Sequence, residues 1–390
     1  MIEAGENIKY TSVVCLMENI VNRFAKKWIH NLAIYEPGRP LEELARELGV
    51  DDMSDMHKLA SNENSLGPSP KAVESMKHAA ASMNIYPDGG AFYLRRALAR
   101  KLDVDADQIV LGNGSNELIV FLSHVFLNAD RNIVMSDKAF VIYKMAAAMF
   151  EADTIVVPMR DYHHDLDAMV AAVTPDTRLL YVSNPNNPTG TMVDNEAIER
   201  MMHQIPDHVT VVFDEAYIEL LPPECQPDTL RYVREGRNVF VLRTFSKSYG
   251  LAGLRVGYTI STKKDAKLLQ HVRQPFNVNA MAQVGALAAL EDDEHLEKTR
   301  ATVQAGLRQL ERGLREMKIE FVESVANFML VNVGRGRETF EALQRLKIIV
   351  RPMDGYGMPE MIRVTIGTEL QNRCFLDALK LLLNERTVNT

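Results

Sequence analysis

The stretch "RTFSKSYGLAGLRVGY", Arg243–Tyr258, places one lysine between two serines and follows it with three glycines and an arginine. The run "NVFVLRT" (Asn238–Thr244) is apolar and β-branched over the length of a buried strand, so Lys247 lies just beyond a predicted strand end. Open α/β sheets carry their chemistry at such ends. Taken alone, the stretch favours a lysine on a solvated Ser/Gly loop, and the rest of the chain has to decide.

Other short runs share this buried-strand character. They are "QIVLGNG" (Gln108–Gly114), "NIVMS" (Asn132–Ser136), "TIVVP" (Thr154–Pro158), "RLLYVS" (Arg178–Ser183), "VTVVFDE" (Val209–Glu215) and "RVGYTIS" (Arg255–Ser261). Their apolar character is continuous rather than alternating, which is typical of strands buried on both faces. The pattern predicts an α/β fold with a mostly parallel seven-stranded sheet between helices.

The pattern changes beyond about residue 290. Residues 292–317 read as one long charged amphipathic helix, and "EFVES", "FMLVNV", "IIVRP" and "MIRVTIG" then suggest a smaller mixed sheet with helices near 337–346 and 368–383. A chain of 390 residues exceeds the usual domain of roughly 100 to 200 residues. We expect a large domain over 58–291, a smaller α+β domain over 292–390, and an N-terminal segment, 1–57, that packs with the small domain.

Composition narrows the class of protein. With 46% hydrophobic and 25% charged residues and a formal net charge of -8, the chain has no electrostatic footprint for nucleic acid. No apolar run approaches the roughly 18 residues of a membrane span, and the first residues lack the pattern of a signal peptide. The cysteines are three in number and widely scattered. These features predict a cytoplasmic protein that binds neither nucleic acid nor membranes.

Further polar motifs follow predicted strands. In "LGNGSNE", Gly114, Ser115 and Asn116 stand between a strand and a helix, where glycines and free N–H groups attract phosphate, although a plain capped turn uses the same residues. "NPNNPTG" (Asn184–Gly190) is a rigid turn with amide side chains. In "DEAY", Asp214 follows five apolar residues, and its carboxylate is costly to bury unless it meets a cation or donors.

Together these weak signals specify one ligand, pyridoxal phosphate. That cofactor needs a phosphate cradle, an amine that forms a Schiff base, and an acid that keeps its ring nitrogen protonated. Lys247 and Asp214 fit the last two needs, and Ser246 and Arg255 can hold phosphate oxygens, since a guanidinium makes paired charge-assisted hydrogen bonds.

"NPNNPTG", "DEAY" and "TFSKSYGLAGLRVGY", in that order and spacing, resemble the fold-type I pyridoxal-phosphate aminotransferases, and the resemblance extends over nearly the whole chain. Within them, "LASNENSLGPSP", "YPDGG", "VANFMLV", "IIVRPMDGYGMPEMIRVTIG" and "YEPGRP" are closest to the histidinol-phosphate aminotransferases of histidine biosynthesis. Aromatic aminotransferases and an amino-acid-phosphate decarboxylase share much of this frame and remain as alternatives. The resemblance implies an enzyme that moves an amino group from a small-molecule donor to 2-oxoglutarate.

The resemblance also implies roles for particular residues. Lys247 matches the Schiff-base and proton-shuttling lysine, Asp214 the partner of the ring nitrogen, and Asn187 with Tyr217 the pair at the ring 3′-oxygen. The expected phosphate and ring contacts are Gly114, Ser115, Asn116, Ser246, Arg255 and, stacked on the ring, Phe140. In "DKAFVIY", Lys138 and Ala139 replace the usual Pro-Thr, which leaves Tyr143 open as the stacking residue. Tyr86 resembles a tyrosine that reaches the neighbouring subunit's cofactor in a homodimer.

Substrate recognition rests on Arg363, which resembles the anion-binding arginine, with Arg351, Tyr35 and Asn64 as weaker candidates. No metal-ligand spacing occurs, and His163 and His164 in "RDYHHDLD" fit surface histidines better than ligands. Product analysis separates the alternatives, because an aminotransferase consumes a keto acid and forms glutamate, whereas a decarboxylase releases carbon dioxide.

Overall fold

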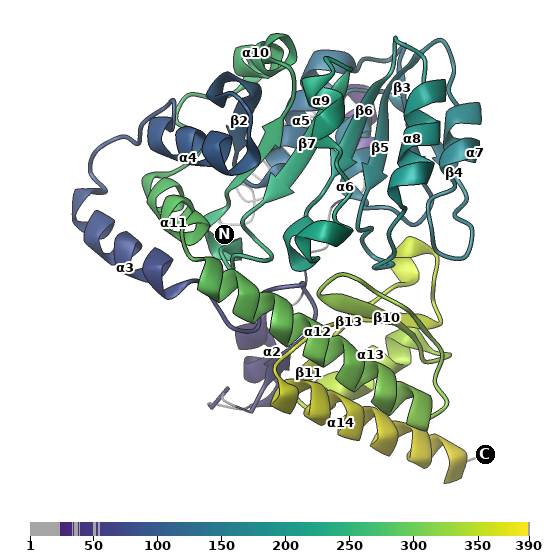
Figure 1. The fold of residues 1–390 in the computed structure, drawn as a ribbon. Helices are drawn as coiled ribbons and strands as arrows, with labels where there is room; N and C mark the ends of the chain where they lie inside the picture. Colours follow the sequence, from purple (N-terminus) through teal and green to yellow (C-terminus); the bar gives the residue numbers. More distant parts are fainter. Residues whose placement is uncertain are drawn as a thin grey trace, which may run out of the picture.

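The structure is a computed structural model that describes residues 24–32, 34, 38, 40–49, 52–53 and 55–388. Its largest sheet has the order β2-β8-β7-β6-β5-β3-β4 (Figure 1). The strands are β2 (Ile109–Gly112), β3 (Asn132–Ser136), β4 (Asp153–Val157), β5 (Thr177–Ser183), β6 (Thr210–Asp214), β7 (Val239–Thr244) and β8 (Gly257–Ile260). Each of the seven predicted runs contains or overlaps one of them.

Parallel pairing dominates this sheet. β3 through β7 pair in parallel with their neighbours, whereas β8 pairs antiparallel with both β7 and β2. The predicted mostly parallel seven-stranded sheet is therefore confirmed. Parallel neighbours need crossover connections, and the intervening helices supply them.

Helices cover both faces of the large sheet. They are α3 (Pro70–Ala79), α4 (Phe92–Leu102), α5 (Ser115–Phe126), α6 (Ile142–Met149), α7 (Leu166–Ala171), α8 (Asn195–Gln204), α9 (Leu230–Arg234), α10 (Lys263–Val272) and α11 (Ala280–Leu290). Successive strand residues alternate between two apolar cores: Leu180 packs in the core that includes α4, α8 and α11, and Leu179 in the core that includes α5, α6 and α10. Both faces are buried, which explains why the strands read as continuous apolar runs.

The C-terminal part builds a second, smaller sheet. α12 (Asp293–Glu316) leads to β9 (Phe321–Val322), β10 (Phe328–Asn332), α13 (Gly336–Arg345), β11 (Ile348–Ile349), β12 (Arg351–Pro352), β13 (Met361–Thr365) and α14 (Glu369–Val388). The antiparallel order is β12-β13-β10-β9, and residues of α12 and α14 pack in its apolar core. Figure 1 shows α12 and α14 beside β10 and β13.

Chain from before the large sheet joins this second region. β1 (His57–Lys58) pairs in parallel with β11, and α2 (Leu41–Leu48) packs through Leu44 and Ala45 near Ile349. The packing of the whole segment 1–57 with the small domain and the domain limits at 57 and 291 stay predictions. No helix within the described ranges is long and apolar enough to cross a membrane.

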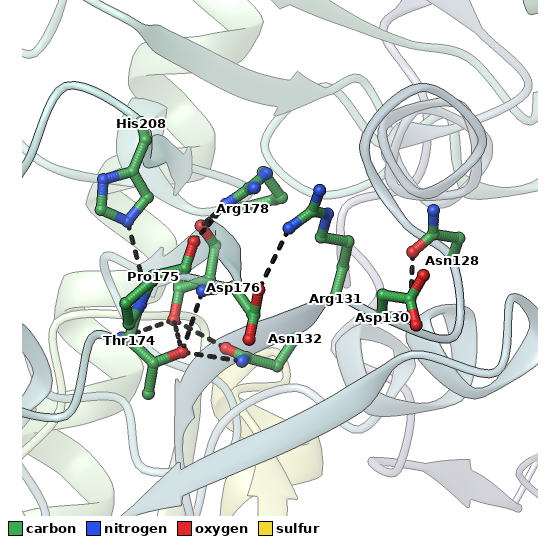
Figure 2. Close-up of polar contacts among 10 residues, drawn as sticks. Asn128, Asp130, Arg131, Asn132, Thr174, Pro175, Asp176, Arg178 and His208 are labelled. Carbon is green, nitrogen blue, oxygen red and sulfur yellow. Dashed lines mark hydrogen bonds and ion pairs between the residues drawn. The ribbon is translucent and has the colours of Figure 1, made fainter.

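The amino ends of β3 and β5 carry a network of polar side chains, drawn in Figure 2. Asn132 donates to Thr174 Oγ1 at 3.0 Å and accepts from Thr177 Oγ1 at 2.7 Å. Arg131 pairs with Asp176 at 3.1 Å. Polar groups at this edge thus bind one another.

Candidate active site

The opposite, carboxyl edge of the large sheet opens into a cavity of about 710 Å³. The sequence candidates that line it are Ser115, Asn116, Phe140, Asn187, Asp214, Tyr217, Ser246, Lys247, Arg255, Arg351 and Arg363. A smaller cavity of about 390 Å³, beside Arg95 and Arg273, contains none of them. The large cavity is therefore the candidate active site.

Asp214 ends β6 and lies at the cavity wall, with 3% of its surface exposed. Its Oδ2 accepts a hydrogen bond from the Tyr143 hydroxyl at 2.7 Å. Its Oδ1 is buried and has no hydrogen-bond partner within the part of the chain that the structure describes. Burial raises the pKa of Asp214 to about 6, so the carboxylate is charged at neutral pH and lacks a full set of donors.

Lys247 follows β7 and extends into the same space. Its Nζ donates to the Ser61 carbonyl at 3.0 Å and lies 5.8 Å from the centre of the Tyr217 ring. Burial, followed by the charge of Arg363, lowers the pKa of Lys247 to about 7. A large fraction of this amine is unprotonated near neutral pH, which is the nucleophilic form.

Tyr217 and Asn187 reach the cavity from the turns after β6 and β5. The Tyr217 hydroxyl accepts from Asn62 Nδ2 at 3.0 Å, and Asn187 Oδ1 accepts from Arg363 Nη1. Asn62 has a φ of 55°, a left-handed conformation that asparagine tolerates better than most residues. Burial raises the pKa of Tyr217 to about 12, so the phenol keeps its proton.

The amino end of α5 forms a cradle beside Arg255. Gly114 caps this helix with a φ of 76°, and a Cβ there would lie 2.6 Å from Arg255 Nη2. A Cβ at Gly257 would lie 2.5 Å from the Ser115 nitrogen, so only glycine lets β8 approach the start of the helix. The first N–H groups of a helix lack intrahelical partners and attract anions. With Ser246 and Arg255 alongside, the cradle suits a phosphate.

Arg363 and Arg351 occupy opposite positions on the antiparallel strands β13 and β12. Arg363 is 7% exposed, its Nη2 donates to the Ala60 carbonyl at 2.8 Å, and both arginines line the cavity. Like charges directly opposite each other on a sheet are destabilising. Two guanidinium groups facing one cavity therefore indicate an anionic ligand.

Phe140 and Tyr143 are the two candidates for the residue that stacks on a bound ring. Tyr143 is fully buried, stacks on Tyr181 at 4.3 Å and donates to Asp214, whereas Phe140 lines the cavity. The geometry therefore leaves Phe140 as the residue available to a ring bound there.

Two predicted residues, Asn64 and Tyr86, do not line the cavity. Asn64 turns away from it and donates to the Ser248 carbonyl at 3.1 Å and to Thr299 Oγ1 at 3.0 Å. Tyr86 is 80% exposed and stacks on Phe276 at 4.8 Å. Tyr35 lies outside the described residues.

Sequence reasoning missed Asn62 and the role of Tyr143 beside Asp214. Asn62 stands inside the quoted motif "LASNENSLGPSP", so the signal was present without an assigned atom. The expectation of two surface histidines is wrong for His164, which is buried between Ser136 Oγ at 2.6 Å and the Ser183 carbonyl at 2.9 Å. The polar appearance of "RDYHHDLD" hid this contact.

The residues present fit pyridoxal phosphate. Asp214 offers an unsatisfied carboxylate oxygen to a protonated ring nitrogen, Lys247 offers an amine, and the α5 cradle offers N–H groups and a guanidinium to a phosphate.

Comparisons with known proteins agree with this geometry. Residues 54–379 match the family described as Aminotransferase class I and II. The chain is 48% identical over 364 residues to the histidinol-phosphate aminotransferase of Akkermansia muciniphila, covering 93% of this chain and 99% of that relative.

Solved structures agree in fold. The histidinol-phosphate aminotransferase of Sinorhizobium meliloti, in complex with pyridoxal-5′-phosphate, superposes with a TM-score of 0.82 at 25% identity, covering 92% of this chain and 98% of that one. The L-threonine-O-3-phosphate decarboxylase of Porphyromonas gingivalis superposes with a TM-score of 0.73 at 22% identity, covering 84% of this chain and 100% of that one, and shows the fold alone. The fold-type I architecture expected from the sequence is confirmed.

Proposed function

The chain belongs to the class I and II aminotransferases, and from that premise we propose that it transfers the amino group of histidinol phosphate to 2-oxoglutarate with pyridoxal phosphate as cofactor. The observation that carries the choice of donor is the pair Arg351 and Arg363, which face the cavity from opposite strands. The 48% identity to a histidinol-phosphate aminotransferase over most of both chains supports it.

Residues on every side of the cavity would hold the cofactor. Asp214 Oδ1 would accept from the ring nitrogen, Asn187 and Tyr217 would contact the ring oxygen, and Phe140 would cover a ring face. The phosphate would be bound by Gly114, Ser115, Asn116, Ser246 and Arg255. When bound, pyridoxal phosphate supplies an aldehyde that links to amines and a protonated ring that draws electrons from the amino-bearing carbon.

Lys247 then has two tasks. Its amine, with a pKa lowered to about 7, would bind the cofactor aldehyde, and when unlinked from the cofactor Nζ would take up a proton from the donor's amino-bearing carbon. The Ser61 carbonyl and the Tyr217 ring hold Nζ at one place in the cavity. A base that can be both protonated and neutral near pH 7 is suited to moving a proton in both directions.

Arg363 binds the anionic end of each substrate in turn. The phosphate of histidinol phosphate and a carboxylate of glutamate both match a guanidinium fork. A phosphate offers more oxygens and up to two charges, so Arg351 assists it selectively. An aromatic amino acid donor would leave Arg351 without a phosphate to bind.

We also propose that the active unit is a cytoplasmic homodimer in which Tyr86 reaches the neighbouring site. Tyr86, Ile85, Tyr93 and Phe276 are exposed, Tyr86 stacks on Phe276, and large exposed apolar groups of this kind mark contact sites. Mixing Lys247→Ala subunits with Tyr86→Phe subunits should create one intact site per heterodimer and restore activity toward half of the wild-type value. Proven exchange without recovery would place Tyr86 outside its neighbour's site.

A panel of amino donors tests the reaction. With 2-oxoglutarate present, the protein should form glutamate fastest from histidinol phosphate and more slowly from aromatic amino acids. Arg351→Ala should weaken the binding of histidinol phosphate by about 1.5 to 3 kcal/mol, the range of a charged hydrogen bond. It should weaken the binding of glutamate, the donor of the reverse half-reaction, by less. Release of carbon dioxide without formation of glutamate would contradict the proposed reaction. Equal losses of binding for histidinol phosphate and glutamate in Arg351→Ala would contradict the selective role of Arg351.

A further inference from the structure

The loop that carries Lys247 rests on a buried polar cluster outside the cavity lining. The cluster is formed by Glu215, Glu219, Arg243 and Ser248. Glu215 follows β6, and its Oε2 accepts from Arg243 Nε and Nη2, each at 2.8 Å. Arg243 therefore pairs with Glu215. Glu219 lies in the same cluster, and no cation among the described residues is bonded to its carboxylate.

Glu219 lies two residues after Tyr217, in the 3-10 turn η4 (Ile218–Leu220). Its Oε2 accepts from the Ser248 hydroxyl at 3.4 Å, and its Oε1 is buried with no hydrogen-bond partner in the described part of the chain. A buried carboxylate that is only partly satisfied is destabilising. Burial raises the pKa of Glu219 to about 7, against the opposing charge of Arg243.

The surroundings hold both ends of this contact in place. Arg300, on α12, donates through Nε to the Glu219 carbonyl at 2.6 Å. Asn64 bridges the Ser248 carbonyl and Thr299 on the same helix. The turn after Tyr217 and the loop after Lys247 are thus both tied to α12, and the hydrogen bond from Ser248 to Glu219 links them directly.

We propose that Glu219 is a positioning residue, which through Ser248 fixes the loop of Lys247 against the turn of Tyr217. It keeps Lys247 Nζ above the Tyr217 ring, where that distance is 5.8 Å. The inference rests on the proposed function, because it assigns Glu219 to the reaction of Lys247. Glu219 does not line the cavity, and a positioning role accounts for a destabilising acid at a place where an apolar side chain would pack.

The charged and titratable groups around Glu219 come from several elements. They are Glu215 after β6, Arg243 on β7, Tyr249 on the lysine loop, Tyr258 on β8 and, through its backbone contact, Arg300 on α12. A substitution at Glu219 also alters the electrostatic interactions among these groups. The test therefore needs a control variant within the same cluster.

Thr229 provides that control. Its hydroxyl donates to Glu215 Oε1, within the cluster but away from the lysine loop. Thr229→Val should lower the melting temperature and leave the holoenzyme's visible absorbance and kcat unchanged.

Glu219→Gln, Ser248→Ala and the double variant form the test. Each should lower kcat of both half-reactions by roughly ten-fold with little change in KM, because positioning rather than binding is lost. The pH midpoint of the visible absorbance of the lysine-bound cofactor should move. The double variant should resemble the worse single variant, since both changes act on one contact: Ser248→Ala removes its donor, and Glu219→Gln removes the charge of its acceptor. Glu219→Asp, which keeps the charge, should recover part of the rate.

Loss of thermal stability alone, with the absorbance midpoint and kcat of the wild type, would overturn the proposal, as would additive effects in the double variant. Should Glu219→Gln fail to fold, Ser248→Ala, which removes a single oxygen, decides by the same two readouts. The absorbance midpoint reports on Lys247 whatever the donor, whereas failure of the wild type to form glutamate from histidinol phosphate would contradict only the proposed function.

Discussion

The two edges of the large sheet contain similar residues and differ in how those residues are satisfied. At the amino edge, Arg131 pairs with Asp176 and Asn132 donates to Thr174 (Figure 2). Asn132 also accepts from Thr177. At the carboxyl edge, Asp214 keeps a buried oxygen without a partner in the described ranges, and two arginines of the small sheet, Arg351 and Arg363, line the same cavity.

The difference shows how a ligand site is recognised without its ligand. Polar residues that satisfy one another stabilise the fold, whereas buried charges left partly unsatisfied reduce stability and persist where a ligand completes them. The predictions below test this distinction, beginning with the carboxyl edge, where we expect the largest effects.

Replacing the lysine should have the largest effect. Lys247→Ala removes both the amine that links to the cofactor and the group that moves the proton, so glutamate formation should fall by at least about 10³-fold. Purified wild type should be yellow, and the variant should bind cofactor without this lysine-linked absorbance. Arg178→Ala at the amino edge serves as the control and should keep its rate. Turnover near the wild-type value in Lys247→Ala would remove the lysine from the mechanism.

Asp214→Asn should separate activity from stability. The amide keeps the shape but loses the charge that holds the ring nitrogen protonated, so kcat should fall by about 100-fold or more. Burial raises the pKa of Asp214 to about 6, so the folded protein binds an extra proton between roughly pH 4 and 6, and the ionised form destabilises the fold above that window.

The apoprotein of Asp214→Asn should therefore be more stable than wild type at pH 7, by on the order of 3 kcal/mol. This advantage should shrink as the pH falls from 7 to 4, because the wild-type carboxylate takes up its proton. Urea unfolding of both apoproteins across this range measures it. A less stable variant at pH 7 would mean that donors in the apoprotein satisfy the carboxylate.

A smaller effect is expected from Tyr143→Phe. The Tyr143 hydroxyl donates to Asp214 Oδ2 and opposes the rise in its pKa, so its loss should raise that pKa further, by about one unit for a charged hydrogen bond. The acid limb of the pH–rate profile should move upward accordingly. Tyr181→Phe, in the ring stacked on Tyr143, is the matched control. An unmoved limb would show that Asp214 does not set it.

The contrast between the edges was only partly predictable from the sequence. The buried strands are predictable because short continuous apolar runs are typical of strands covered on both faces. Asp214 and Lys247 are predictable because they are charged residues that follow such runs closely. Asn62, Tyr143 and Glu219 gave no such signal. Their importance comes from one hydrogen bond each, to a residue 155, 71 or 29 positions away, and tertiary packing alone creates that proximity.

The smallest effect is expected at the amino edge, from Asp176→Asn. Arg131 and Asp176 form a solvent-exposed ion pair at 3.1 Å, and exposed pairs contribute about 0 to 1 kcal/mol because water screens them and two side chains lose freedom. The free energy of unfolding should fall by no more than that, and by less in high salt. Both half-reactions should keep their kcat and KM, since the pair lies at the opposite end of the sheet from Lys247.

Asn132→Ala tests the same edge, because it removes the two hydrogen bonds of Asn132 with Thr174 and Thr177. The free energy of unfolding should fall by about 1 kcal/mol for each hydrogen bond, again without a kinetic effect. A changed turnover in either variant, with stability intact, would show that the amino edge takes part in the reaction, and satisfied polar networks would then no longer distinguish scaffold from site.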